Sequence, residues 1–134
     1  MNKEFVPYEQ ALKLKEIDFD EPCYKYVYVG DTGTNVDHYL EVEPSKAKNY
    51  NEDDLCISQP TFSQAFRWFR EKYDIDIDMD VVFSKHDDGI SLKNYKVLIP
   101  FHDELFINVG LFTTYEEAEL ECLKKLIKIQ GGNK

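Results

Sequence analysis

The chain has 134 residues and a formal net charge of −10, from 26 acidic and 16 basic residues, with 43% hydrophobic and 14% aromatic residues. This length predicts one domain, residues 1–134, and the apolar content argues against intrinsic disorder. An acidic surface repels phosphate backbones and anionic headgroups, so neither direct nucleic-acid binding nor membrane attachment is expected; attraction to a basic partner and plain solubility both fit.

The cysteines and the amino terminus indicate a compartment. Cys23, Cys56 and Cys122 are odd in number, widely spaced and without any Cys-x-x-Cys pair, which is typical of reduced thiols in a cytosol. The amino terminus has no apolar signal core, and no stretch reaches the ~18 apolar residues of a membrane span. We expect a cytoplasmic protein without a membrane segment.

The first part of the chain predicts a helix, a hairpin and a loop. Residues 7–16 open with a proline and carry a short apolar stripe, which favours a helix. Residues 23–29 and 36–42 alternate on either side of a turn-rich stretch, so they predict a hairpin. One face of its first strand is tyrosine-rich: Tyr24, Tyr26 and Tyr28. Residues 43–57 lack periodicity and predict a surface loop.

Residues 58–73 hold the pattern around which we expect the core to assemble. Five apolar side chains share one helical stripe: Phe62, Ala65, Phe66, Phe69 and Tyr73. Thr61 and Gln64 form a capping box at the start of this helix.

Three strands and a helix are predicted for the rest of the chain. Residues 74–81 alternate strictly, and Val82 and Phe83 extend this strand, one face of which carries a row of aspartates: Asp74, Asp76, Asp78 and Asp80. After a less regular run at 90–94, residues 95–101 alternate and predict the next strand, with Pro100 expected at a strand end or edge. Residues 105–112 are apolar on both faces and predict a central strand.

The final helix begins with two overlapping capping boxes, Thr113 with Glu116 and Thr114 with Glu117, and residues 131–134 form a disordered tail. Its broad apolar face predicts packing against both sheet and helix. The element order α-β-β-α-β-β-β-α predicts an α+β fold in which a single, mainly antiparallel sheet of about five strands packs against three helices.

Trp68 and its neighbours are the main candidates for a protein interface. Trp68 lies roughly 110° from the aromatic stripe, so burial of the stripe does not by itself bury the indole. Because Trp, Tyr and Arg dominate interface hot spots, the partner-binding candidates are Arg67, Trp68, Arg70, Tyr24, Tyr26 and Tyr28. The alternative, which we favour on balance, is that a neighbouring loop or the tyrosine face covers Trp68.

The aspartate row has two functional interpretations. Neighbouring members lie ~7 Å apart on one face, so a divalent cation could bridge a pair, although no calcium-loop glycine or bidentate glutamate accompanies them. Together with Glu41 and Glu43 the row is also the candidate acidic face of a nucleic-acid mimic. The structural alternative, a solvated strand face that prevents edge-to-edge aggregation, is favoured.

Two histidines lie beside carboxylates: His86 in residues 86–88 and His102 in residues 102–104. Such clusters are typical of acid–base catalysis and of metal sites. Successive turns of a meander lie at opposite ends of a sheet, ~20 Å apart, so the two clusters should not form one site. Ordinary polar turns explain both clusters better than a catalytic or metal site does.

His38 fits a histidine in the core or at its boundary. The Gly30/Gly33 pair links two strands and does not open a helix, so it does not form a phosphate-binding loop. We therefore assign no catalytic residue, metal ligand or cofactor, and the sequence leans against an enzyme.

Three segments carry a resemblance: EFVPYEQAL at residues 4–12, QPTFSQAFRWFREKY at 59–73 and TYEEAELECLKKLI at 114–127. They resemble a set of small uncharacterised proteins encoded by bacteriophages and prophage-like elements of gut-type anaerobic bacteria. The resemblance covers the three predicted helices, about a third of the chain. It implies a mobile-element origin and a cytoplasmic location, and it carries no assigned activity, site or cofactor.

The leading functional hypothesis is a non-enzymatic intracellular protein-binding module of phage or mobile-element origin. It would contact an unidentified protein through the Trp68 helix, the tyrosine-rich hairpin or the 43–54 loop. The alternative is an acidic decoy that mimics nucleic acid and inhibits a host protein that binds DNA or RNA, and a further alternative is a small hydrolase or transferase built on His86 or His102. Salt dependence separates the first two, because the decoy weakens steeply with salt.

Overall fold

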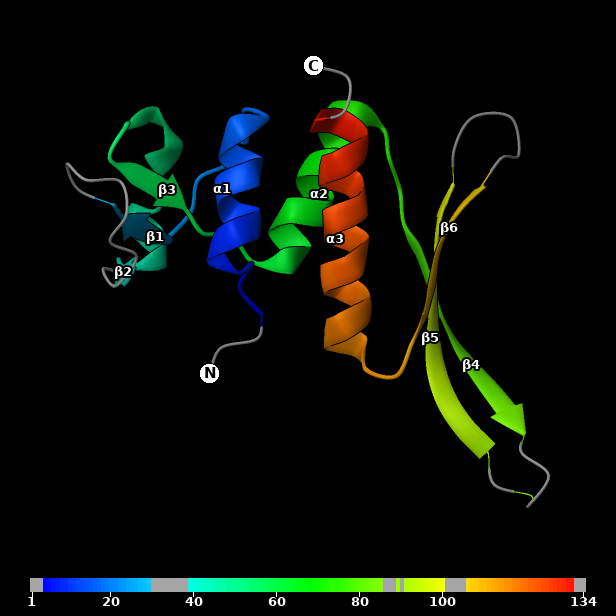
Figure 1. Cartoon of the computed structure of the whole chain (residues 1–134). Coiled ribbons are helices and arrows are strands. Elements are labelled where there is room, and N and C mark those ends of the chain that lie inside the picture. The colour runs from blue at the N-terminus through cyan, green and yellow to red at the C-terminus, as the bar shows by residue number, and fades with distance from the viewer. Residues whose placement is uncertain (1–3, 30–38, 86–88, 90, 101–105, 132–134) are drawn as a thin grey trace.

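The structure, a computed structural model, describes residues 4–29, 39–85, 89, 91–100 and 106–131. Within these ranges the chain forms three α-helices and two three-stranded antiparallel sheets (Figure 1). The α+β class is confirmed, and the expected single sheet of about five strands is wrong.

The first sheet has the strand order β2-β1-β3. It contains β1 (Lys25–Tyr28), β2 (Tyr39–Glu41) and β3 (Cys56–Ser58). The expected hairpin is confirmed, since β1 and β2 pair antiparallel. The expected surface loop at residues 43–57 is wrong at its end, because β3 begins at Cys56. A strand of three residues is too short to show the alternation by which strands are recognised in a sequence.

The segment before β3 is also more ordered than the sequence suggests. Two single turns of 3₁₀ helix, η1 (Pro44–Lys46) and η2 (Tyr50–Glu52), lie in it. The ring of Tyr50 stacks on Tyr26 at 3.8 Å between centroids, and its backbone N–H donates to Ser58 Oγ at 3.0 Å. These contacts hold η2 against the tyrosine face of the first sheet.

The second sheet is a meander of β4 (Asp78–Lys85), β5 (Ser91–Pro100) and β6 (Phe106–Phe112). Pro100 ends β5, as expected for a residue that cannot donate to the ladder. β5 is the central strand and β6 lies at an edge, so the central position expected for the last strand is wrong. Apolar residues on both of its faces misled that prediction, since only one face packs on the core.

A bulge shapes the edge strand β6. Val97 pairs with Gly110 and Leu98 with Asn108, so the register shifts between the two pairs. Gly110 has φ 141°, and a Cβ placed there would lie 3.2 Å from the Phe112 ring. The bulge therefore depends on glycine at this position.

All three expected helices are present: α1 (Tyr8–Glu16), α2 (Phe62–Tyr73) and α3 (Tyr115–Gly131). Thr61 Oγ1 accepts a hydrogen bond from Gln64 N, and Thr114 Oγ1 accepts one from Glu117 N, both at 3.1 Å. α3 runs through Gly131, while residues 132–134 of the expected tail lie outside the described residues. No helix in the described part of the chain is long and apolar enough to span a membrane.

The helices stand between the two sheets (Figure 1). α1 contacts β3 and α3, and α3 in turn contacts α2, β5 and β6, so the broad apolar face of α3 packs against helix and sheet as expected. Its buried residues are Ala118, Cys122, Leu123, Leu126 and Ile127. In Figure 1 all three helices lie on one side of the second sheet, which leaves the other face of that sheet without a helix.

Candidate functional site

The structure places Trp68 in the core. Its side chain is 3% exposed, and its indole Nε1 donates a hydrogen bond to Asp20 Oδ1 at 2.9 Å. Its ring packs edge-on against Phe19, itself buried, with centroids 5.1 Å apart. The connector between α1 and β1 folds over the indole, which is the loop-covered alternative that the sequence favoured, so Trp68 itself is not open to a partner.

The other partner-binding candidates divide between two places. Arg67 and Arg70 are exposed on α2, and Arg67 Nε lies 3.9 Å from Glu21 Oε1 in the connector. The tyrosines make other contacts: Tyr24 packs edge-on against Phe5 at 5.6 Å, and Tyr26 stacks on η2. Tyr28 is exposed at the end of β1. Only parts of this set are therefore open to a partner.

The four aspartates do not form one row on one strand, so that expectation is wrong. Asp74 ends α2 in a left-handed conformation, φ 56°, a state that Asp tolerates better than most residues. Asp76 is exposed in the connector, and β4 begins only at Asp78. In the register of β4 and β5, Asp80 lies opposite Lys96. Glu41 lies on β2 of the first sheet, whereas Asp78 and Asp80 lie on β4 of the second.

The candidates for acid–base and metal chemistry lie largely outside the described part of the chain. Among its residues no group of three or more His, Cys, Asp or Glu side chains is placed to hold a metal ion. His38, His86, His102, their neighbouring carboxylates and the Gly30/Gly33 pair lie outside the described residues.

The three thiols are buried and free. Burial raises the pKa of Cys23 and of Cys122 to about 12. Burial, followed by the nearby Asp53 carboxylate, also raises the pKa of Cys56. Reactive thiols have a lowered pKa and are partly exposed, whereas these three cysteines are buried and have a raised pKa, as is typical of cysteines that pack in a core.

Among the described residues there is an open apolar groove that local sequence patterns do not reveal. It has a volume of about 710 Å³. We call it the aromatic groove, and its lining residues are Phe5, Pro7, Tyr8, Lys25, Tyr39, Gln59, Phe62, Glu116, Glu117 and Leu120. They come from the amino-terminal segment, the β1–β2 hairpin, the start of α2 and the first turns of α3, so only the folded chain brings them together.

Backbone hydrogen bonds fix one side of the aromatic groove. Val6 N donates to Pro60 O, and Phe62 N donates to Glu4 O, both at 2.9 Å. Gln59 Nε2 donates to Val6 O at 3.0 Å. These bonds clamp the amino-terminal segment to the start of α2, so Phe5 and Phe62 are held in place before any ligand binds.

The aromatic groove combines apolar rings with charges of both signs. Phe5 and Phe62 are buried at its base, whereas Tyr39 is 53% exposed. Lys25 Nζ lies 4.2 Å from the centroid of the Phe5 ring, and the opposite charge comes from Glu116 and Glu117 in the first turn of α3. Apolar walls with a few charged groups are typical of ligand sites.

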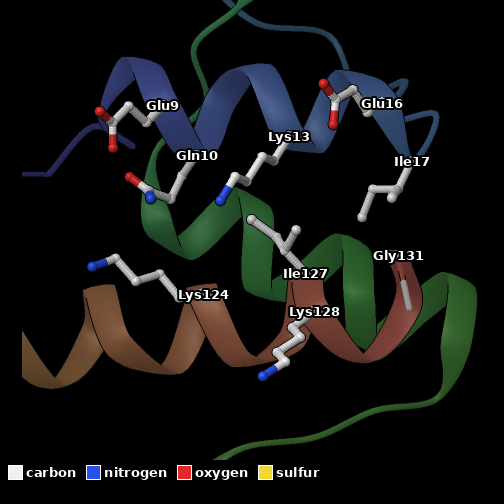
Figure 2. Close-up of a pocket in the computed structure, with 9 residues that line it drawn as sticks. All are labelled: Glu9, Gln10, Lys13, Glu16, Ile17, Lys124, Ile127, Lys128 and Gly131. Atoms are coloured by element: carbon white, nitrogen blue, oxygen red, sulfur yellow. The ribbon is translucent and has the colours of Figure 1, made fainter.

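A second groove, between α1 and α3, is a weaker candidate (Figure 2). It has a volume of about 540 Å³. In Figure 2, Lys13 points from α1 toward α3, whereas Lys128 points away from the groove. Most of its lining is charged: Glu9, Lys13, Glu16, Lys124 and Lys128. Long charged side chains that extend over two packed helices keep their charged ends in water. This groove is therefore better explained as the solvent-exposed junction of two helices than as a ligand site.

The comparisons with known proteins leave the aromatic groove as the basis for a functional conclusion. The sequence matches no protein-family model, no curated protein and no solved structure.

Proposed function

We propose that the chain is a non-enzymatic protein-binding module, whose aromatic groove binds an apolar side chain of a partner segment next to a basic residue. The observation that carries the proposal is the convergence of four distant segments on one open apolar groove. A cytoplasmic location and a phage or mobile-element origin belong to the same proposal and rest on the resemblance of the three helices. Nucleic acid and membrane are not its ligands.

The lining explains why a protein segment fits. An apolar side chain that leaves water for such a groove gains about 1.5–3 kcal/mol, and the half-buried ring of Tyr8 and the exposed ring of Tyr39 offer such surface above the buried rings of Phe5 and Phe62. Glu116 and Glu117 favour a neighbouring lysine or arginine on the ligand. The net charge of −10 also speeds encounter with a basic partner.

The acidic-decoy hypothesis has less support. Its four aspartates do not share one strand, since Asp74 ends α2 whereas Asp78 and Asp80 lie on β4. The hydrolase or transferase alternative rests on His86 and His102, which lie outside the described residues.

Selection from a displayed library of random twelve-residue peptides tests the proposal. The expected selected peptides carry an aromatic or aliphatic residue beside Lys or Arg, and their affinity falls by only a few-fold between 50 and 500 mM salt, because the apolar contact is not screened. Tyr39→Ala and Glu117→Lys should each weaken binding about fivefold or more, which is about 1 kcal/mol. Matched controls outside the groove, Tyr28→Ala and Glu71→Lys, should leave binding unchanged.

Two results would overturn this proposal. Peptides that bind the wild type and both groove variants equally would remove the aromatic groove as the site. Basic peptides whose affinity collapses at 500 mM salt, with no apolar residue in common, would favour the acidic decoy.

A further inference from the structure

The free edge of β6 is the second surface that lacks a partner. β6 pairs with β5 along one edge, and none of the described strands pairs with its other edge. Phe106 and Leu111 are 58% and 61% exposed on the sheet face away from α3. Ile107, Val109 and Phe112 are partly buried and pack on the core.

The two edges of this sheet differ in a way that points to binding. β4, the opposite edge strand, carries Asp78 and Asp80, and charges on an edge strand prevent pairing with other chains. β6 reads Phe-Ile-Asn-Val-Gly-Leu-Phe, without a charged residue or a proline. An uncharged edge of this length is a template for an added strand.

A small basic groove runs beside this edge. It has a volume of about 260 Å³ and lies between β6 and α3. Asn108, Val109 and Phe112 line it from β6, and α3 contributes Glu121, Lys124, Lys125 and Lys128. Glu121 Oε2 pairs with Lys124 Nζ at 3.0 Å, so three lysines face one carboxylate in a chain whose net charge is −10.

We propose that the free edge of β6 binds an extended acidic segment of another protein as a fourth strand. Its main chain would pair with β6, and its carboxylates, on alternate residues, would lie against Lys124, Lys125 and Lys128. Residues on its other face would cover Leu111 and Phe106. This surface is separate from the aromatic groove and does not depend on the proposed function.

A second copy of the chain fits this edge less well. Twofold pairing of β6 with itself is isologous, so it would place the lysines of one α3 beside those of the other. Like charges brought together in this way oppose association. Charge complementarity therefore favours an acidic partner over a second copy.

The probe for this edge is an eight-residue peptide of alternating glutamate and valine, titrated into the full chain by fluorescence anisotropy. The double variant Lys124→Gln/Lys128→Gln should bind about tenfold more weakly, since each exposed charge pair contributes up to about 1 kcal/mol. The matched double variant Lys46→Gln/Lys72→Gln removes the same charge elsewhere and should bind within twofold of the wild type.

Backbone methylation separates strand addition from simple charge attraction. In an alternating strand the amides of the glutamates point to one edge and those of the valines to the other. One peptide N-methylated on every glutamate and one on every valine should therefore differ, with only one of them losing at least tenfold in affinity.

Four results would overturn the proposal. Equal binding of the two methylated peptides would mean that charge attraction, and not strand pairing, accounts for the affinity. If an alternating lysine–valine peptide bound as tightly as the glutamate–valine peptide, the three lysines would have no role in binding. Full competition by a thymidine oligonucleotide of the same charge would indicate a general polyanion site. A dimer that Leu111→Lys dissociates would assign the edge to a second copy.

Discussion

Substitution of Asp20 tests whether the connector between α1 and β1 holds Trp68 in the core. Asp20→Ala removes the acceptor of the indole Nε1–H, which lies 2.9 Å from Asp20 Oδ1 in a side chain that is 3% exposed. Hydrogen bonds to charged groups contribute about 1.5–3 kcal/mol. Asp20 is itself exposed, so water replaces part of the loss, and we expect a cost of about 1 kcal/mol.

Urea unfolding measures this cost directly, because Trp68 is the chain's one tryptophan and reports on its own environment. Asp20→Ala should lower the free energy of unfolding by about 1 kcal/mol and the melting temperature by about 4 °C. Asp20→Asn keeps an acceptor oxygen and should cost less than about 0.5 kcal/mol. A solvent-exposed emission maximum in the native wild type, or an unchanged stability of Asp20→Ala, would refute the reasoning.

Three further predictions concern stability. Asp74 has φ 56°, so Asp74→Ala should cost about 0.5–1 kcal/mol and Asp74→Gly nothing, with Asp76→Ala as a neutral control in the same urea assay. Gly110→Ala should cost about 1–3 kcal/mol, because φ is 141° and the added Cβ meets the Phe112 ring at 3.2 Å; a neutral result would contradict the strained bulge. Cys23 and Cys122 have a pKa of about 12 in the folded chain against 9.0 without burial. The unfolded chain therefore releases these protons first, and stability should fall between pH 9 and pH 12, by up to about 1.4 kcal/mol per pH unit for each thiol. Cys122→Ala should have a shallower slope in urea titrations across this range, and an equal slope would contradict the assignment.

The helices were predictable because their signals are local. The stripe that contains Phe62 and Phe69 repeats at the helical period, and the capping threonines Thr61 and Thr114 lie next to the residues they cap. The pairing of β4 with β5 was predictable for the same reason, because the two strands follow one another directly in the sequence, whereas β6, apolar on both faces, was expected at the centre of the sheet and lies at its edge. Periodicity and capping need no knowledge of distant segments.

The division into two sheets was not predictable in the same way. β3 has three residues, too few to show an alternating pattern. No pattern in the neighbouring sequence indicates that β3 pairs with β1 and not with a strand of the β4–β5–β6 sheet. The burial of Trp68 likewise depends on Phe19 and Asp20, 49 and 48 residues away in the sequence. Such contacts arise only when the chain has folded.

The aromatic groove escaped sequence analysis for the same reason. Its residues run from Phe5 to Leu120 and share no motif or spacing. The excess of aromatic residues was the one available signal, and it did not say where the rings gather. The sequence directed attention to Trp68, whereas the open rings lie on other elements, among them Tyr8 on α1 and Tyr39 on β2.

Mapping a selected peptide by amide chemical-shift changes tests the central claim most directly. With a peptide enriched on the wild-type chain, the largest shifts should fall on the amides of Phe5, Lys25, Tyr39, Glu117 and Leu120, and at a subsaturating peptide concentration Tyr39→Ala should reduce them severalfold. Shifts confined to β4, or to other elements outside the aromatic groove, would contradict a protein-binding module that acts through this groove.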